Sequence, residues 1–202
     1  NNGTLSVTSA LAGTGGLTNG AGSTLNLGFT GTVGITTLNA SASGNTVHYN
    51  YAGTQNVFPT TYYNLKFSGN GVKTFPSSTT TTVNGTLTMA NGAAGCTVSG
   101  TLNYGANATL FIDQDLSLGS STVWTDFPGT GGVIINSGTT TLGEVKTITY
   151  GLAINSGAKL NLGSYAHTTA TLRLGGVDQV AGSWGGSSSS ATNKNDTYFT
   201  ST

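Results

Sequence analysis

The two acidic residues that lie closest together in the chain are Asp113 and Asp115, separated only by Gln114. If both belong to one β-strand, residues i and i+2 lie on the same face, about 6 to 7 Å apart. That separation is close to the carboxylate spacing of glycosidases, and the same oxygens could contribute to a calcium site. No basic residue or further acidic cluster stands near the pair in sequence. We therefore interpret it first as solvated carboxylates, with calcium binding and then catalysis as alternatives.

Other residues with reactive side chains are sparse. His48 and His167 are 119 positions apart, so they form no zinc-binding motif, and no nucleophile-elbow motif surrounds either of them. The single cysteine, Cys96, has no partner for an intramolecular disulfide, and we interpret it as a small buried side chain. These observations predict a non-enzymatic protein that needs no cofactor, with calcium as the one possible exception.

Aromatic side chains are concentrated in one segment of the chain. Tyr49, Tyr51, Tyr62 and Tyr63 lie within fifteen residues of one another, while Trp124 stands apart. Exposed aromatic rings can stack on sugars, whereas aromatics in alternating strands are usually core residues. We retain these five residues as predicted contacts for a glycan or a protein partner.

The charge content excludes several classes of partner. The 202 residues include six Lys and Arg and six Asp and Glu, and the net charge is zero. Nucleic-acid binding requires basic patches that neutralise phosphates, and anionic membrane surfaces attract similar clusters. No run of about 18 apolar residues is present either, so membrane insertion is not expected. A neutral surface lacks the repulsion that keeps molecules apart, which favours contact with copies of the same chain.

Residues such as those discussed above must be positioned by β-strands, because helical periodicity is almost missing. Short runs alternate apolar and polar residues, as in 47–51 and 63–67, and Asn-Gly or Ser-Gly pairs separate them. Alternation with frequent turn residues predicts an all-β protein.

Internal repeats indicate how these strands are arranged. The motif at 82–87 (TVNGTL) returns at 97–102 as TVSGTL, and Ile-Asn-Ser-Gly at 135–138 returns at 154–157. Degenerate repeats of about 20 residues predict the coils of a parallel β-helix, or β-solenoid. An antiparallel β-sandwich or jelly roll, with Asn-Gly hairpins, is the alternative.

The chain contains no convincing linker, so we expect a single β-solenoid domain over residues 1–202. Within it, 45–76 forms a more irregular, aromatic-rich insertion or neighbouring coil. Residues 172–202 form a terminal closing segment.

Two stretches resemble a known class of proteins. Residues 45–92 carry Y-Y-N-L-x-x-S-G-x-G-x-K-T from Tyr62, followed by V-x-G-x-L from Val83. Residues 172–200 include Leu-Gly-Gly-Val, Ala-Gly-Ser-Trp-Gly and Asn-Asp-Thr-Tyr-Phe. Both resemble secreted bacterial surface repeat proteins of the autotransporter-like β-helix passenger type. The resemblance implies an exported β-solenoid at the cell surface, adhesive or structural, and it assigns no catalytic residues.

Together these features predict an extracellular structural protein that assembles with copies of itself into a surface filament, sheath or layer. An N-terminal strand containing Leu5 and Val7 is the candidate assembly strand, because an all-β subunit can lend a strand to a neighbour. The alternative is a cell-surface adhesin or glycan-binding module. A carbohydrate-active enzyme or an ice-binding protein is less favoured.

Overall fold

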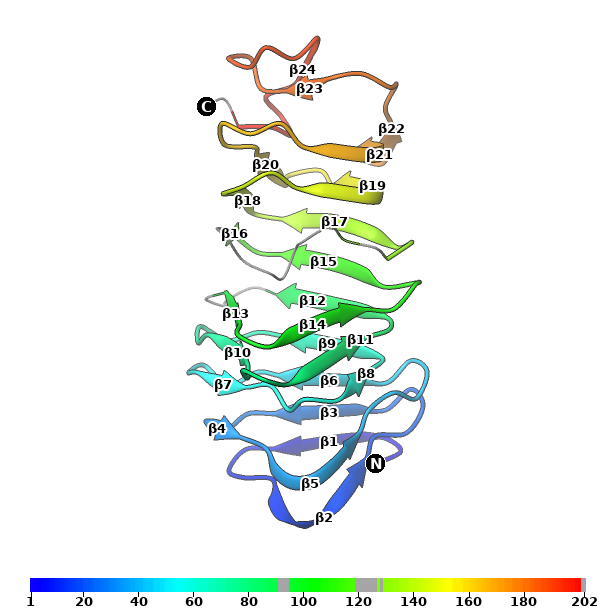
Figure 1. Cartoon of the computed structure of the whole chain (residues 1–202), viewed down its shortest axis with the longest axis vertical. Coiled ribbons are helices and arrows are strands. Elements are labelled where there is room, and N and C mark those ends of the chain that lie inside the picture. The colour runs from blue at the N-terminus through cyan, green and yellow to red at the C-terminus, as the bar shows by residue number, and fades with distance from the viewer. Residues whose placement is uncertain (91–94, 119–126, 128, 201–202) are drawn as a thin grey trace. The chain divides into compact units, whose positions relative to one another are not determined.

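The chain is a stack of short parallel β-strands. The computed structural model describes residues 1–90, 95–118, 127 and 129–200 (Figure 1). Stacked parallel strands form a β-solenoid with coils of about 21 residues, which confirms the predicted parallel β-helix. Among the strand pairs whose direction is described, only one is antiparallel, so the sandwich alternative is wrong. Within the described residues no helix has the length and apolar character needed to cross a membrane.

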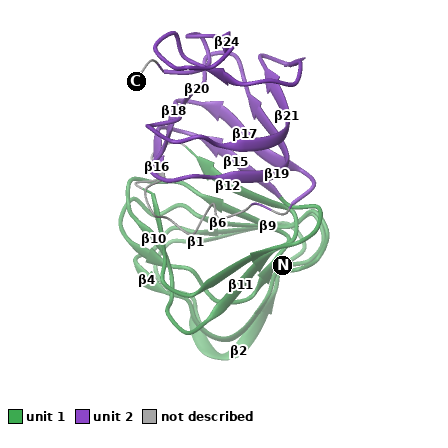
Figure 2. Cartoon of the chain, turned by 45° about the horizontal axis from the view of Figure 1, so that its top comes forward, with its two compact units in different colours: residues 1–108 green, residues 109–202 purple. Residues whose placement is uncertain are grey.

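The chain divides into two compact units, residues 1–108 and 109–202, coloured separately in Figure 2. Each unit carries the same pattern of stacked parallel strands, and each is described by itself below.

Unit 1 has coils with three faces. The first face consists of β1 (Thr4–Val7), β3 (Thr24–Leu27), β6 (Thr46–Tyr49), β9 (Asn64–Phe67) and β12 (Thr86–Ala90). The second face consists of β4 (Gly31–Thr32), β7 (Gln55–Asn56), β10 (Lys73–Phe75) and β13 (Cys96–Val98). The third consists of β8 (Thr61–Tyr62), β11 (Thr80–Val83) and β14 (Thr101–Tyr104), with a separate pair of β2 (Ala12–Thr18) and β5 (Gly34–Asn39).

Unit 2 has two main faces. One consists of β15 (Thr109–Asp113), β17 (Gly132–Ser137), β19 (Thr147–Ile154) and β21 (Thr168–Leu174). The other consists of β16 (Leu116–Leu118), β18 (Thr139–Leu142) and β20 (Lys159–Asn161). Three short strands follow: β22 (Val177–Asp178), which is antiparallel to β21, and the parallel pair of β23 (Trp184–Gly185) and β24 (Asn193–Lys194).

The core of unit 1 is a set of inward ladders that run from coil to coil. Leu25, Val47, Leu65 and Leu87 occupy equivalent positions of successive strands, and each is fully buried. Alternation places every second residue of a strand on the inner face. Burying each of these side chains contributes about 1.5 to 3 kcal/mol. The aromatic-rich segment 45–76 continues these ladders through β6 and β9, so it forms coils in register with their neighbours.

The two sequence repeats have different structural meanings. Ile135 pairs with Ile154 across β17 and β19, so the 19-residue repeat spans one coil. The 15-residue repeat does not span a coil, because Val83 pairs with Tyr104 and not with Val98. Val83 precedes the corner between β11 and β12, whereas Val98 precedes the corner between β13 and β14. That motif therefore marks two different corners, which corrects the interpretation of both repeats as coils.

Candidate functional site

Unit 1 has an open edge at its first coil. Among the described residues, β1 pairs only with β3 and β2 pairs only with β5. Leu5 and Val7 lie in register with the fully buried Leu25 and Leu27, yet both are half-buried. The predicted assembly strand is thus a real edge strand. Its inward side chains keep part of their surface in solvent.

This open edge also lacks charged side chains. Residues 1–65 contain no Asp, Glu, Lys or Arg, and the amino group of Asn1 donates to Thr18 O at 2.8 Å. Natural edge strands are usually protected by charged side chains, proline, bulges or covering loops, because unpaired backbone groups template the pairing of another chain. Neither β1 nor β2 contains a charged residue or a proline.

The predicted aromatic contact cluster is largely a core feature. Tyr49 and Tyr62 are 1% and 0% exposed, so the prediction that they contact a glycan is wrong. Burial raises the pKa of the Tyr49 hydroxyl to about 12 and that of Tyr62 well above its usual value. Tyr51 and Tyr63 lie outside the strands and are half-buried. Trp124 lies outside the described residues.

Asp113 and Asp115 lie on either side of a corner and do not share one strand. Asp113 ends β15, the chain bends at Gln114, and Asp115 precedes β16. Asp113 accepts hydrogen bonds from Asn136 Nδ2 at 2.9 Å and Ser137 Oγ at 2.8 Å.

Asp115, in turn, accepts from the backbone N–H of Thr139 at 2.7 Å. Both carboxylates therefore tie their own corner to the corner of the next coil. The expectation that they share one strand face is wrong. No group of three His, Cys, Asp or Glu side chains lies within metal-binding reach in the described part of the chain.

A polar stack occupies the second face of unit 1, where apolar residues are expected. Gln55 and Lys73 begin β7 and β10, lie in register, and are 1% and 0% exposed. Gln55 Nε2 donates to Leu27 O at 2.8 Å and to Phe29 O at 2.9 Å. Lys73 Nζ donates to Tyr51 O at 2.8 Å and, more weakly, to Gly53 O at 3.3 Å. Each side chain therefore reaches back to satisfy the corner carbonyls of the preceding coil.

Lys73 has no counter-ion, because no carboxylate lies within 4.0 Å of its Nζ among the described residues. Burial lowers the pKa of its amino group to about 8. Lys73 is fully enclosed, so its role is structural. The next inward position of this stack is Cys96, which is in register with Lys73 and has a thiol pKa raised by burial.

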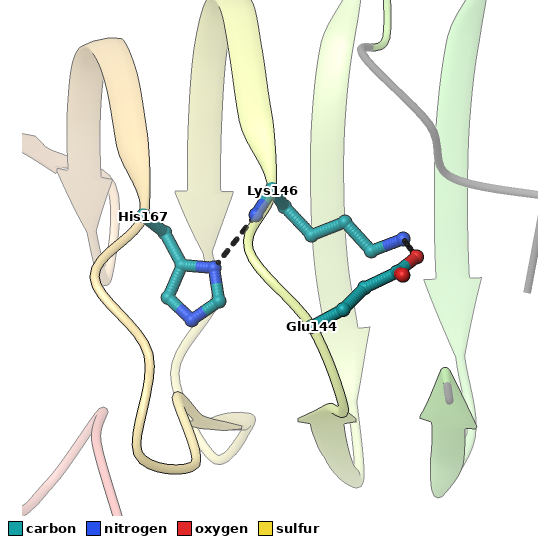
Figure 3. A network of polar contacts seen from close by, with 3 residues as sticks. All are labelled: Glu144, Lys146 and His167. Carbon is teal, nitrogen blue, oxygen red and sulfur yellow. Dashed lines mark hydrogen bonds and ion pairs between the residues drawn. The ribbon is translucent and has the colours of Figure 1, made fainter. Parts of the chain in front are cut away.

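Unit 2 contains a second buried lysine, which is paired (Figure 3). The Lys146 side chain is 1% exposed, and its Nζ lies 2.6 Å from Glu144 Oε1. The Lys146 backbone N–H donates to Nδ1 of His167 at 3.1 Å, and His167 Nε2 lies 2.9 Å from Leu162 O. Since Nδ1 accepts, Nε2 carries the hydrogen that is donated to Leu162 O. This network holds the loop before β21 against the loop before β19.

Residues 177–200, here called the closing segment, cover the last coil of unit 2. Leu160 of β20 donates its N–H to Tyr198 O at 2.8 Å and accepts from Thr200 N at 3.1 Å. A cavity of about 1060 Å³ lies between this segment and the inner surface of β18 to β21. The residues that line it lie between positions 142 and 199, all within unit 2. The closing segment predicted from the sequence begins at residue 172, which lies in β21, whereas the segment that covers the last coil begins at β22. The sequence predicted neither the cavity nor the polar stack.

In comparisons with protein-family models, curated proteins and solved structures, this chain has no match.

Proposed function

We propose that this chain is a non-enzymatic structural protein that associates with copies of itself through the open edge of its first coil. The observation that carries the proposal is the combination found at β1: an unpaired edge, half-buried Leu5 and Val7, and no charged side chain. An edge of this kind is a template for strand pairing, because its outward N–H and C=O groups have no strand partner among the described residues. We propose an extracellular location, which rests on the resemblance of residues 45–92 and 172–200 to bacterial surface proteins.

The geometry of pairing follows from the direction of backbone groups in β1. Gly3 O and Val7 O accept from Thr24 and Gly28 of the β3 side. Backbone groups of successive strand residues point alternately to the two sides. The N–H and C=O of Thr4 and Ser6 therefore face the open edge, where a second chain would add.

The covered last coil of unit 2 favours a closed pair over a filament. In unit 2 the closing segment occupies the edges of β20 and β21, through Phe199 and β22. Head-to-tail growth would need that edge to be free. We therefore propose that the elementary assembly is a two-fold pair in which two first coils meet. Surface filaments, sheaths or layers would require further contacts of such pairs.

Other candidate functions have weaker support. The adhesin alternative is weakened because Tyr49 and Tyr62, two of its predicted contact residues, are buried in the core. The use of Asp113 and Asp115 in corner hydrogen bonds supports a protein that is not a glycosidase.

Ser6→Pro tests the proposal directly. Proline at this position removes an N–H that faces the open edge and leaves the β1–β3 backbone hydrogen bonds in place. Like Ser6→Ala, it also removes the Ser6 Oγ that accepts from Asn26 Nδ2 at 3.1 Å. Analytical ultracentrifugation over a concentration series should give twice the 20.2 kDa chain mass for the wild type and for Ser6→Ala. Ser6→Pro should remain monomeric with an unchanged far-UV circular dichroism spectrum. A wild type that stays monomeric at several hundred micromolar would overturn the proposal.

A further inference from the structure

We infer that the cavity of unit 2 binds an uncharged, predominantly apolar small molecule. The cavity volume of about 1060 Å³ is at the upper end of the range that ligand pockets occupy. This inference goes beyond self-association, and it involves residues of unit 2 only.

The floor of the cavity is made of the inward side chains of the last coil. Leu142, Ile148, Leu152 and Leu160 line it, together with Phe199 of the closing segment. All five are at most 7% exposed. In a continuing solenoid such side chains would contact the next coil, but here the closing segment arches over them and leaves space. An apolar molecule in that space would supply the contacts that the next coil provides elsewhere.

Several polar side chains of the lining are already engaged with the protein. Trp184 Nε1 donates to Val180 O at 3.1 Å, and Thr169 Oγ1 donates to Thr171 O at 2.8 Å. Ser189 Oγ donates to Gly186 O at 2.7 Å.

Gln179 and His167 are engaged in the same way, since Gln179 Nε2 donates to Val177 O at 2.8 Å and both His167 ring nitrogens have partners. A sugar site needs side-chain donors and acceptors that are free to meet hydroxyl groups. The use of these donors inside the protein favours an apolar ligand over a saccharide.

Charge in the lining points the same way. Asp178 is the one acidic residue of the lining, and its Oδ1 lies 3.5 Å from Arg173 Nε. No lysine or arginine lines the cavity. An anionic ligand would therefore enter this space without a counter-ion, which is costly, and a cationic one would compete with Arg173 for Asp178.

Two large apolar side chains of the lining are exposed to solvent. Val180 is 72% exposed and Tyr165 is 42% exposed, and both line the cavity. They present an apolar rim where a ligand enters, and such exposed apolar groups commonly mark binding sites.

Fluorescence of N-phenyl-1-naphthylamine, an uncharged aromatic probe, tests this inference. The chain has two tryptophans, so Trp124→Phe leaves Trp184 of the cavity lining as the only donor for energy transfer. In this background we expect saturable probe binding accompanied by quenching of Trp184 emission. Ala181→Phe and Ala191→Phe, which narrow the cavity, should each weaken binding at least tenfold.

Ala106→Phe is the matched control, because Ala106 lies on an exposed turn of unit 1 and should leave probe affinity unchanged. Urea unfolding midpoints identify any variant that fails to fold. If one of the two cavity variants does not fold, the other still tests the inference. Probe binding without quenching of Trp184 would place the site elsewhere and overturn the inference. Binding of maltotriose in place of the probe would overturn it too, in favour of a saccharide site.

Discussion

The hydroxyl groups of Tyr49 and Tyr62 lie 3.1 Å apart inside unit 1, although the two residues are on different faces of the coil. Phe58 N–H donates to Tyr49 Oη at 2.9 Å, and Tyr62 Oη donates to Phe58 O at 2.6 Å. Because the Tyr62 hydrogen is used in this way, Tyr49 donates to Tyr62. The two hydroxyls therefore close a ring of hydrogen bonds around the Phe58 backbone and fix the link between β7 and β8.

Tyr49→Phe should destabilise unit 1 by about 1 to 3 kcal/mol, because it leaves the Phe58 N–H without its acceptor in a part-buried position. Urea unfolding followed by circular dichroism measures the loss. Tyr63→Phe is the control, since Tyr63 is half-buried and lies outside this ring, and it should change stability by less than about 0.5 kcal/mol. Equal effects of the two variants would contradict the role of the ring.

His48 makes stability depend on pH in the acidic range. Burial, followed by the charges of Lys66 and Lys73, lowers the pKa of its imidazole from 6.5 to about 4. Below pH 6.5 the imidazole of His48 is protonated in the unfolded chain but stays neutral in the folded chain until the pH nears 4. The His48 contribution is therefore fully present above pH 6.5 and is lost as the pH falls to about 4.

Urea midpoints at pH 7.5 and 4.5 check this prediction, and the decrease should be smaller in His48→Gln. Lys66→Met should raise the pKa of His48 by removing a nearby positive charge. An NMR titration of His48 with a midpoint near 6.5 in the wild type would show the prediction to be wrong.

Lys73 has the corresponding effect at alkaline pH. Between its folded pKa of about 8 and its ordinary value of 10.5, the unfolded chain holds a proton that the folded chain has released. Stability of the wild type relative to Lys73→Met should therefore rise across this interval, by on the order of 2 kcal/mol. Comparing the two proteins at each pH cancels the ionisation of Cys96 and the tyrosines. A difference that is flat from pH 8 to 10.5 would exclude a buried, unpaired amine.

Gly138 and Gly157 end the two copies of the Ile-Asn-Ser-Gly repeat and form a matched pair. Both have positive φ, +70° and +88°. A Cβ at Gly138 would lie 2.5 Å from Asp115 N and from Gln114 C, whereas one at Gly157 would meet nothing within 4 Å. Gly157→Ala should thus cost about 1 to 2 kcal/mol from backbone strain alone.

Gly138→Ala adds a steric clash to the same strain, so its cost should exceed that of Gly157→Ala by about 1 to 3 kcal/mol. Urea unfolding of both variants measures the difference. Equal losses of stability would contradict the prediction, because they would mean that the close backbone at Gly138 adds no steric cost.

The sequence predicted the fold class well because alternation and turn residues are local signals. Val47 and Leu65 could be assigned to the inner face from the two-residue period alone, and Ile135 and Ile154 from their 19-residue repeat. Burial of Tyr62 could not be assigned, because it depends on which face of the coil the strand joins.

Other features depend on corners, which alternation does not describe. Asp113 and Asp115 are separated by a bend at Gln114, so the rule for strand faces fails there. Lys73 is enclosed because it meets the corner carbonyls of residues 51 and 53, a contact between coils that no local pattern reveals. The cavity depends on where the closing segment passes, and that path is set by tertiary contacts such as Leu160 with Tyr198 and Thr200.

The inward ladders of unit 1 have a consequence for how such a chain can evolve. Equivalent positions hold Leu27, Tyr49, Phe67 and Met89 in turn, so the ladder tolerates side chains of different size as long as each remains apolar. Each coil packs mainly against its immediate neighbours. Duplication or deletion of the coding sequence for one coil of about 21 residues would therefore lengthen or shorten the stack without changing its edges. In this architecture the number of coils and the chemistry of the edges can therefore change independently during evolution.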